Sequence, residues 1–178
     1  NNDDQLLDII APEVIRAFLD DAENGDYQGF PSLGVAVSFT VDPSFRSWLK
    51  LSDDTGGLYV TQVRKGSSAE KAGIEKGDVI TKIGQHAIGR RGYYSDENYG
   101  RLYWNHLIRG NEKINNSLEI SILRDAKEQV LTATLARPVE KLVSPNTFNK
   151  APRYLVKGGF IFQELTYSYL KAFGADWE

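Results

Sequence analysis

The sequence predicts an α+β fold that is mainly β, built as a partly open barrel of about five to six short strands with two helices. Three observations carry this prediction. Short stretches of β-branched and apolar residues recur along the chain, helical patterns are few, and the stretch 118–123 alternates apolar and polar side chains as a half-buried strand does. Hydrophobic residues make up 41% of the 178 positions, which is enough to form a buried core.

The elements of the central region follow from this patterning. Strands are expected at 33–39, 57–63, 78–83, 118–123 and 129–135. The segment 124–128 lies between the last two strands and has the composition of a hairpin turn. A single helical turn is expected at 68–73. A longer helix is expected at 98–109, with an apolar face formed by Leu102, Tyr103, His106 and Leu107.

Both ends of the chain carry further elements. A helix is expected at 12–22, because Pro12 suits the first helical turn and Gly25 suits a stop. Three prolines mark 138–152 as a linker, and a strand at 159–165 and a short helix at 166–173 follow it. We therefore expect a linker helix in 1–28, a central domain in 29–140, and a linker with the start of a truncated second domain in 141–178.

Composition excludes several classes of function. No cysteine is present, so disulfides and thiolate zinc sites are excluded, and His86 and His106 lack metal-ligand spacing. We expect no cofactor and no metal, although carboxylates alone could hold calcium weakly. Lysine and arginine are dispersed, which argues against nucleic-acid binding. No apolar run approaches the ~20 residues of a membrane helix, and the chain begins with Asn1, as a fragment or processed product would.

No catalytic residues are expected, so this chain is predicted not to be an enzyme. A trypsin-like protease brings Ser, His and Asp into one site, and the sequence has no Gly-Asn-Ser-Gly-Gly stretch for the nucleophile. The segment 29–34 has the wrong spacing for a Gly-x-Ser-x-Gly nucleophile elbow. There is no glycine-rich phosphate loop either.

One segment carries a specific pattern. Residues 67–80 read Ser-x-Ala-x-x-Ala-Gly-ϕ-x-x-Gly-Asp-ϕ-Ile, where ϕ is apolar. The small Ala69 and Ala72 let a one-turn helix lie close to the strands, and Gly73 ends that helix. The pattern resembles the PDZ domains of HtrA/Deg serine proteases, which implies a PDZ-like fold for 29–140. Ser68 departs from it, because the family usually has Pro there.

The resemblance implies a peptide-binding groove. In this family a loop of the form x-ϕ-Gly-ϕ holds the C-terminal carboxylate of a peptide with backbone N–H groups, and the peptide adds to the next strand. The segment 32–35 matches that loop, and the helix at 98–109 would form the other wall. The predicted peptide-binding residues are Ser32, Leu33, Gly34, Val35, Ala36, Val37, Leu102 and His106. Tyr103 and Leu107 are rivals for the groove-facing positions, and we interpret His106 as a half-buried residue of an amphipathic helix rather than a selector of ligand Ser or Thr.

The flanking segments extend the resemblance to about residues 9–178. The helix at 12–22 is similar to the one that follows the protease domain in HtrA proteins, and 102–108 and 159–166 resemble two-PDZ plant-type Deg proteases and their bacterial relatives. This implies an upstream trypsin-like protease domain, a homo-oligomeric parent, and quality control through C-terminal or unfolded polypeptide segments. For a bacterial parent it implies the periplasm or cell envelope. A scaffold or assembly module with a closed groove is the alternative, and the flanks argue against an appendage of a secretion or site-two-type protease.

Overall fold

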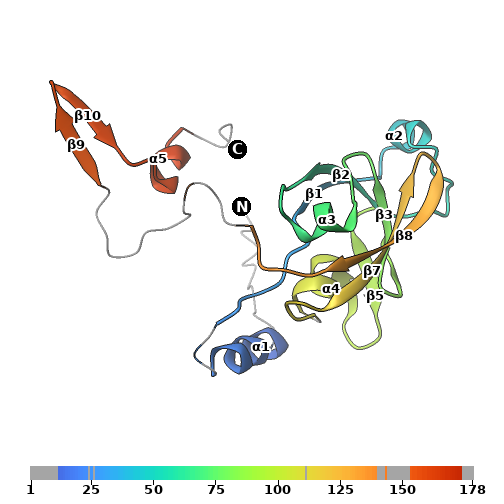
Figure 1. Ribbon diagram of the computed structural model, residues 1–178. Helices are drawn as coiled ribbons and strands as arrows, with labels where there is room; N and C mark the ends of the chain where they lie inside the picture. Colours follow the sequence, from blue (N-terminus) through green and yellow to red (C-terminus); the bar gives the residue numbers. More distant parts are fainter. Residues whose placement is uncertain are drawn as a thin grey trace, which may run out of the picture. The chain divides into compact units, whose positions relative to one another are not determined.

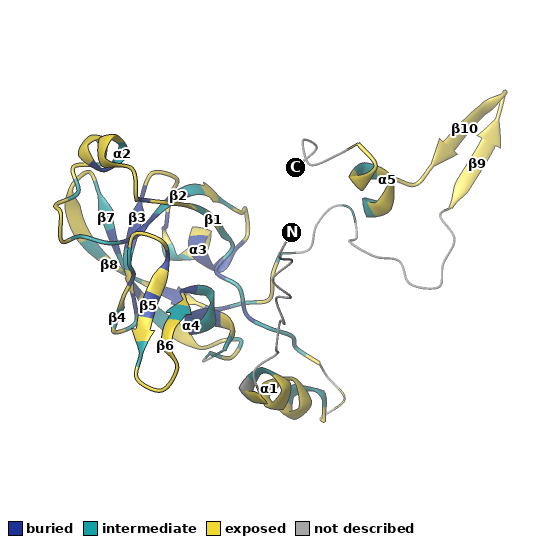
Figure 2. Cartoon of the chain, turned by 180° about the vertical axis from the view of Figure 1, so that it is seen from behind, coloured by how far each residue is buried: buried dark blue, intermediate teal, exposed yellow. Residues whose placement is uncertain are grey.

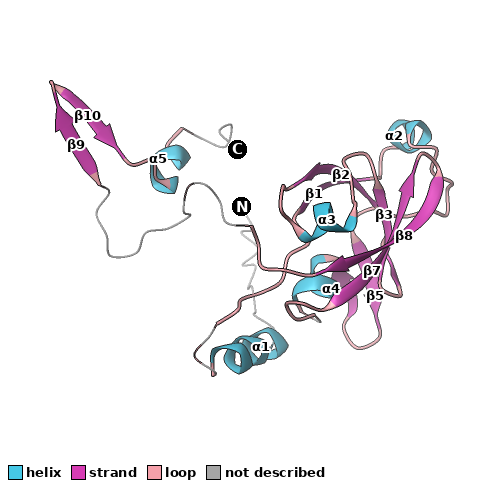
Figure 3. Ribbon diagram, in the orientation of Figure 1, coloured by secondary structure: helices cyan, strands magenta, loops and turns pink. Residues whose placement is uncertain are grey.

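A computed structural model describes residues 12–23, 25, 27–110, 112–139, 143 and 153–173. The chain divides into two compact units, residues 1–139 and 140–178, and each is described by itself. Figures 1 and 3 show the elements of both units. No helix in the described ranges is long and apolar enough to cross a membrane.

The first unit is built on one antiparallel sheet of six strands, in the order β1–β2–β3–β7–β8, with β4 also paired to β3. The strands are β1 (Val35–Phe39), β2 (Leu58–Val63), β3 (Val79–Ile83), β4 (His86–Ala87), β7 (Ser117–Arg124) and β8 (Lys127–Thr134). This confirms the mainly β fold. The sheet is open, and no closed barrel forms among the described residues.

The core lies on one face of this sheet and follows the alternation of the sequence. Along β7, Ile120 and Ile122 are fully buried whereas Glu119 is exposed, and Ala133 of β8 is fully buried between exposed neighbours. The β7–β8 turn falls at Asp125 and Ala126, which both have positive φ, as a two-residue hairpin turn requires. Figure 2 shows the buried residues gathered on the strands of this unit.

Helix α3 (Ser68–Ala72) forms where the sequence predicts it. Ser67 accepts a hydrogen bond from the backbone N–H of Glu70, and Gly73 ends the helix with φ of 85°. Ala69 is fully buried, in agreement with close packing of the helix. Ser68 supplies a contact that proline lacks, because its hydroxyl oxygen accepts a 2.9 Å hydrogen bond from the backbone N–H of Ala136, just beyond β8.

An ion pair between a buried carboxylate and a partly exposed guanidinium fixes the turn that follows α3. Asp78 is 1% exposed and receives two hydrogen bonds from Arg124, from Nε at 2.7 Å and from Nη2 at 2.8 Å. The same carboxylate accepts the backbone N–H of Glu75, and Arg124 also donates to the carbonyl of Gly73. The end of β7 is therefore tied to both ends of the turn between α3 and β3.

The predicted helix at 98–109 is wrong over its first half. Residues 93–103 form a hairpin of β5 (Tyr93–Asp96) and β6 (Gly100–Tyr103), and helix α4 (Asn105–Arg109) is only five residues long. The Asp96 carboxylate accepts the backbone N–H groups of Asn98 and Tyr99, which closes the turn, and Gly100 follows with φ of 74°. Tyr93 and Tyr103 face each other across the strands with ring centroids 5.6 Å apart.

Two more helices belong to this unit. Helix α1 (Pro12–Ala22) forms as expected, and Ile15, Phe18 and Leu19 on it are exposed. Helix α2 (Pro43–Trp48) was not expected. Its start nevertheless carries a local signal, because Asp42 caps the N–H of Phe45 and Pro43 occupies the first turn.

The second unit consists of a hairpin and a short helix. Strands β9 (Tyr154–Lys157) and β10 (Phe160–Gln163) pair around a Gly158-Gly159 turn in which both glycines have positive φ. Helix α5 (Tyr167–Lys171) follows, capped by Thr166. The strand at 159–165 and the helix at 166–173 were expected, whereas β9 was not. All eight residues of the two strands are exposed.

Candidate functional site

Gly34 sets the shape of the loop that precedes β1. Its φ is 80°, a conformation that residues with a side chain rarely adopt. A Cβ at this position would overlap the Cβ of Ser67, the residue that caps α3. Backbone conformation and close approach therefore both require glycine here, and the loop lies directly against the start of α3.

The carbonyl groups of this loop are bonded to the body of the unit, whereas two of its N–H groups are free among the described residues. The carbonyl of Leu33 accepts the N–H of Ala69 at 2.9 Å, and that of Gly34 accepts the N–H of Arg64 at 2.9 Å. The backbone N–H of Ser32 donates to the carbonyl of Ala136. Within the described part of the chain, the N–H groups of Leu33 and Gly34 donate to no acceptor. Two successive unpaired N–H groups next to a left-handed residue can bind an anion.

The strand after this loop has an open edge. Among the described strands, β1 pairs only with β2, at one end of the sheet. The side chains of Val35 and Val37 pack on the core, whereas Ala36, Ser38 and Phe39 are exposed. A β-bulge between Ala36 and Val37 shifts the register in the middle of the strand. The outer backbone groups of β1 can therefore accept one more strand.

The open edge of β1 is only as long as the strand. The backbone N–H of Thr40, the next residue, donates to the carbonyl of Arg90 at 3.0 Å, and its hydroxyl donates to the carbonyl of Gly57 at 2.8 Å. Arg46 of α2 supports this corner, because its guanidinium is buried and donates to the carbonyls of Thr40 and Thr55. Burial, followed by the charge of Arg90, lowers the pKa of Arg46. Sequence reasoning missed this corner together with α2.

The two predicted residues of the second wall do not share a helix. Leu102 lies on β6 and packs against the core, and His106 lies on α4, so they are not one helical turn apart. The two alternative candidates for the groove-facing positions are separated in the same way, because Tyr103 is on β6 and Leu107 is buried on α4. The six predicted residues 32–37 form one continuous loop and strand.

His106 is part of an aromatic cluster that the sequence did not indicate. Its Nδ1 lies 2.6 Å from the hydroxyl oxygen of Tyr94, and its ring stacks on that tyrosine. The other histidine, His86, packs edge-on against the same ring with centroids 4.9 Å apart. Tyr94 is 3% exposed, and burial, followed by the charge of Asp96, raises its pKa. The half-buried His106 therefore has an internal hydrogen-bond partner.

Comparison with protein families decides what this unit is. A family model described as PDZ domain matches residues 31–135. The chain belongs to the PDZ domain family. A second PDZ domain model matches residues 143–178, which include the hairpin and helix of the second unit.

Full-length relatives place the PDZ region among Deg and HtrA proteases. The chain is 29% identical to Protease Do-like 4, mitochondrial, of Arabidopsis thaliana over 168 residues, which are 94% of this chain and 32% of that protein. It is 31% identical to Protease Do-like 2, chloroplastic, of the same plant over 160 residues, or 89% of this chain and 26% of the relative. The chain thus spans about a third or less of the curated relatives it matches.

Solved structures agree in fold. The HtrA-type protease AlgW with decapeptide shares 27% identity and a TM-score of 0.50 with this chain, over 71% of this chain and 34% of that one. The HtrA-type protease AlgW with tripeptide shares 25% identity and a TM-score of 0.51, over 72% of this chain and 39% of that one. This PDZ region is therefore similar to the corresponding region of HtrA-type proteases.

Proposed function

We propose that residues 29–140 bind the C-terminal ends of polypeptides as the regulatory segment of an HtrA-type serine endopeptidase. The observation that carries the proposal is the pair of unpaired N–H groups at Leu33 and Gly34, placed at the head of the open edge of β1. A terminal carboxylate would accept both N–H groups, and the residues before it would pair with β1. The similar AlgW structures hold a tripeptide and a decapeptide, which supports a peptide as the ligand.

The site residues of this proposal are Ser32, Leu33, Gly34, Val35, Ala36 and Val37. Binding should be weak, with Kd on the order of micromolar, because one added strand buries little area and the peptide loses its freedom. In the parent protein the segment would deliver unfolded or C-terminal peptides to the protease domain, and so serve protein quality control in a homo-oligomer.

The test compares one peptide in two forms. A labelled peptide with an apolar last residue is titrated with the chain, once with a free C-terminus and once amidated, and fluorescence anisotropy is measured. Amidation should weaken binding at least about tenfold, because the amide carries no charge to accept the two N–H groups. Equal binding of the two forms would rule out the carboxylate loop.

A second experiment concerns catalysis. Because the sequence contains no Gly-Asn-Ser-Gly-Gly stretch, we expect the purified chain to leave an unfolded protein substrate intact. Cleavage that copurifies with the chain and stops with a serine-directed inhibitor would contradict this assignment.

An assembly module without peptide capture is the alternative, favoured by the exposed apolar side chains of the second unit. It predicts that neither peptide form binds while the chain self-associates. Sedimentation velocity over a hundredfold range of concentration, combined with the titration above, separates the two functions.

A further inference from the structure

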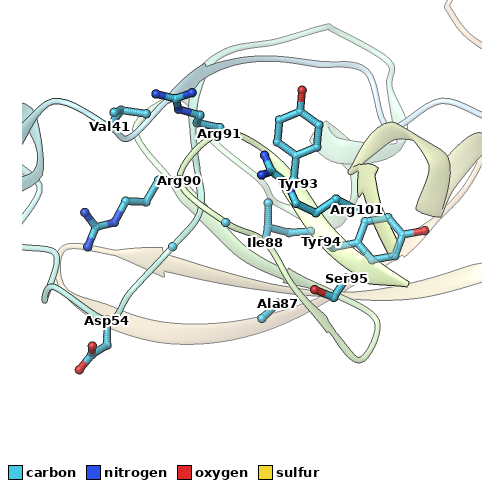
Figure 4. Close-up of a pocket in the computed structure, with 12 residues that line it drawn as sticks. Val41, Asp54, Ala87, Ile88, Arg90, Arg91, Tyr93, Tyr94, Ser95 and Arg101 are labelled. Atoms are coloured by element: carbon cyan, nitrogen blue, oxygen red, sulfur yellow. The ribbon is translucent and has the colours of Figure 1, made fainter. Parts of the chain in front are cut away.

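A cavity of about 600 Å³ lies beside the corner where β1 ends, and three arginine side chains line it. Figure 4 shows Arg90, Arg91 and Arg101 around this one cavity, with Tyr93 and Tyr94. Arg90 and Arg91 come from the segment between β4 and β5, and Arg101 comes from β6. Among the described residues that line the cavity, Asp54 is the only acidic one.

The three positive charges are not neutralised by carboxylates. None of them forms an ion pair within the described ranges of the chain. Arg90 donates to the uncharged backbone carbonyl group of residue Asp53. The guanidinium of Arg101 lies 4.5 Å from the centre of the Tyr93 ring. Both contacts orient a guanidinium and leave donors free, since each guanidinium carries five N–H groups.

Other charges nearby do not reverse this balance. The buried Arg46 stands close enough to Arg90 for the charge of Arg90 to lower its pKa. The charge of Asp53 acts on Arg46 in the opposite sense. At the far end of the hairpin, Asp96 is engaged with two backbone N–H groups of its own turn. The cavity therefore presents unpaired cations to solvent.

The position of the cavity relates it to the proposed peptide. A peptide whose carboxylate sits at the loop runs antiparallel to β1, from Phe39 towards Val35. Five paired residues span about 17 Å, at roughly 3.4 Å for each residue, and the bond between Thr40 and Arg90 ends the edge there. Val41, directly after that bond, lines the cavity. A longer peptide would leave the strand at this corner, next to the cavity that the arginines line.

We propose that this cavity is a second subsite, which binds acidic side chains located about six to nine residues before the C-terminus of the peptide. The inference rests on the proposed function and adds a substrate class to it, namely apolar C-termini preceded by acidic segments. Arginine suits this role, because its planar group can bind a carboxylate through two parallel hydrogen bonds. The arginines are exposed, so each pair contributes modestly and depends on salt.

The test uses three twelve-residue peptides with the same five C-terminal residues. Positions six to nine from the end are Glu and Asp in the first, Gln and Asn in the second, and Lys in the third. At low salt we expect the acidic peptide to bind about three- to tenfold more tightly than the neutral one, and the basic peptide to bind most weakly. The differences should nearly vanish at about 0.5 M NaCl, where charges are screened over a few ångströms.

Variants locate the effect. Arg91→Gln with Arg101→Gln should remove most of the preference for acidic peptides, because only one of the three cations remains, and should leave the affinity for the neutral peptide unchanged. The matched control is Lys76→Gln with Lys127→Gln, two exposed cations that do not line the cavity, one on the turn before β3 and one at the start of β8, which should keep the preference. Arg90 is left intact, because it bonds the loop at Asp53.

The outcomes separate the two proposals. If the acidic and neutral peptides bind equally, C-terminal recognition stands and the second subsite is wrong. If the preference is undiminished in Arg91→Gln with Arg101→Gln, the cavity is not its source. If the amidated acidic peptide binds as tightly as the free one, the cavity does not act together with the carboxylate loop, and this inference fails. If none of the three peptides binds, the proposed function fails first and this inference fails with it.

Discussion

At the scale of single residues, Gly34 allows a direct test of the loop. Gly34→Ala would impose a left-handed conformation on alanine, at a cost of about 1–2 kcal/mol, and would add the overlap with Ser67, for which overpacking data suggest about 1–3 kcal/mol more. Gly73→Ala is the control, because Gly73 has φ of 85° but no atom within 4 Å of an added Cβ. Urea unfolding should show a larger loss of stability for Gly34→Ala than for Gly73→Ala.

A rescue variant completes this comparison. Ser67→Gly removes the overlapping Cβ, and glycine costs only a few tenths of a kcal/mol at a helix N-cap. Adding Ser67→Gly to Gly34→Ala should therefore recover the overlap portion of the loss. If the double variant is no more stable than Gly34→Ala, the two residues are not in contact as described.

The pair of the buried Asp78 with Arg124 gives a second test at this scale. Arg124→Met would leave a buried carboxylate without its cation, which typically costs about 3–5 kcal/mol. Glu75→Gln is the control, because Glu75 also reaches Arg124, at 3.4 Å, but its side chain is 69% exposed, and such pairs contribute about 0–1 kcal/mol. Equal losses for the two variants in chemical denaturation would show that Asp78 is not held by Arg124.

These residues also mark what the sequence can predict. Gly34 and Gly73 stand in local sequence patterns, so a place in a loop for Gly34 and at a helix end for Gly73 could be predicted from their neighbours along the chain. The ion pair of Asp78 could not be predicted in this way, because its partner Arg124 lies 46 residues away and meets it through the pairing of β3 with β7. Contacts of this kind depend on strand register, which local spacing does not determine.

At the scale of elements, the hairpin at 93–103 shows where local patterns are ambiguous. Leu102, His106 and Leu107 have a helical spacing, yet β6 ends at Tyr103 and only the last two lie on α4. The deciding feature is the Asp96 turn with Gly100, whose side-chain hydrogen bonds compete with helix formation. Helix α2 was missed for a different reason. Its Asp-Pro start is a clear signal, but the helix is too short to show a helical spacing of apolar residues.

The Asp96 turn has a defined pH dependence. The N–H groups of Tyr99 and Asn98 bond its charged form and lower its pKa below the ordinary value of 3.8. The carboxylate therefore stabilises the hairpin fully above about pH 5, and the stabilisation is lost as the pH falls through the lowered pKa. In an NMR titration, the Asn98 and Tyr99 amide shifts should change together, with a midpoint below 3.8. Asp96→Asn should abolish that titration while keeping the turn, and a midpoint at or above 3.8 would contradict the assignment.

At the scale of the whole chain, the second unit leaves the apolar side chains of its strands exposed. Its strands carry Tyr154, Leu155, Val156, Phe160, Ile161 and Phe162, all at least 58% exposed. An isolated two-stranded hairpin is only marginally stable in water. We propose that 141–178 begins a second PDZ-like domain, and the PDZ domain model that matches 143–178 supports this.

Hydrogen exchange on the chain tests the state of this unit. Without a partner, the amides of β9 and β10 should exchange within seconds despite their mutual hydrogen bonds. At high concentration we expect protection at 160–163, because exposed apolar strands associate. Protection that is strong and independent of concentration would show that the hairpin is stable by itself or docked within the chain, and would contradict this expectation.

The five-residue edge of β1 also bears on how long a peptide would stay bound. If the proposed peptide binds with Kd on the order of 10 µM and associates at about 10⁶ M⁻¹ s⁻¹, it dissociates at about 10 s⁻¹. Each captured terminus would then stay for only about a tenth of a second. The bond between Thr40 and Arg90 prevents the edge from lengthening, so it keeps this dwell short. If the proposed function holds, such a segment would bind many chain ends in turn and release each within about this time.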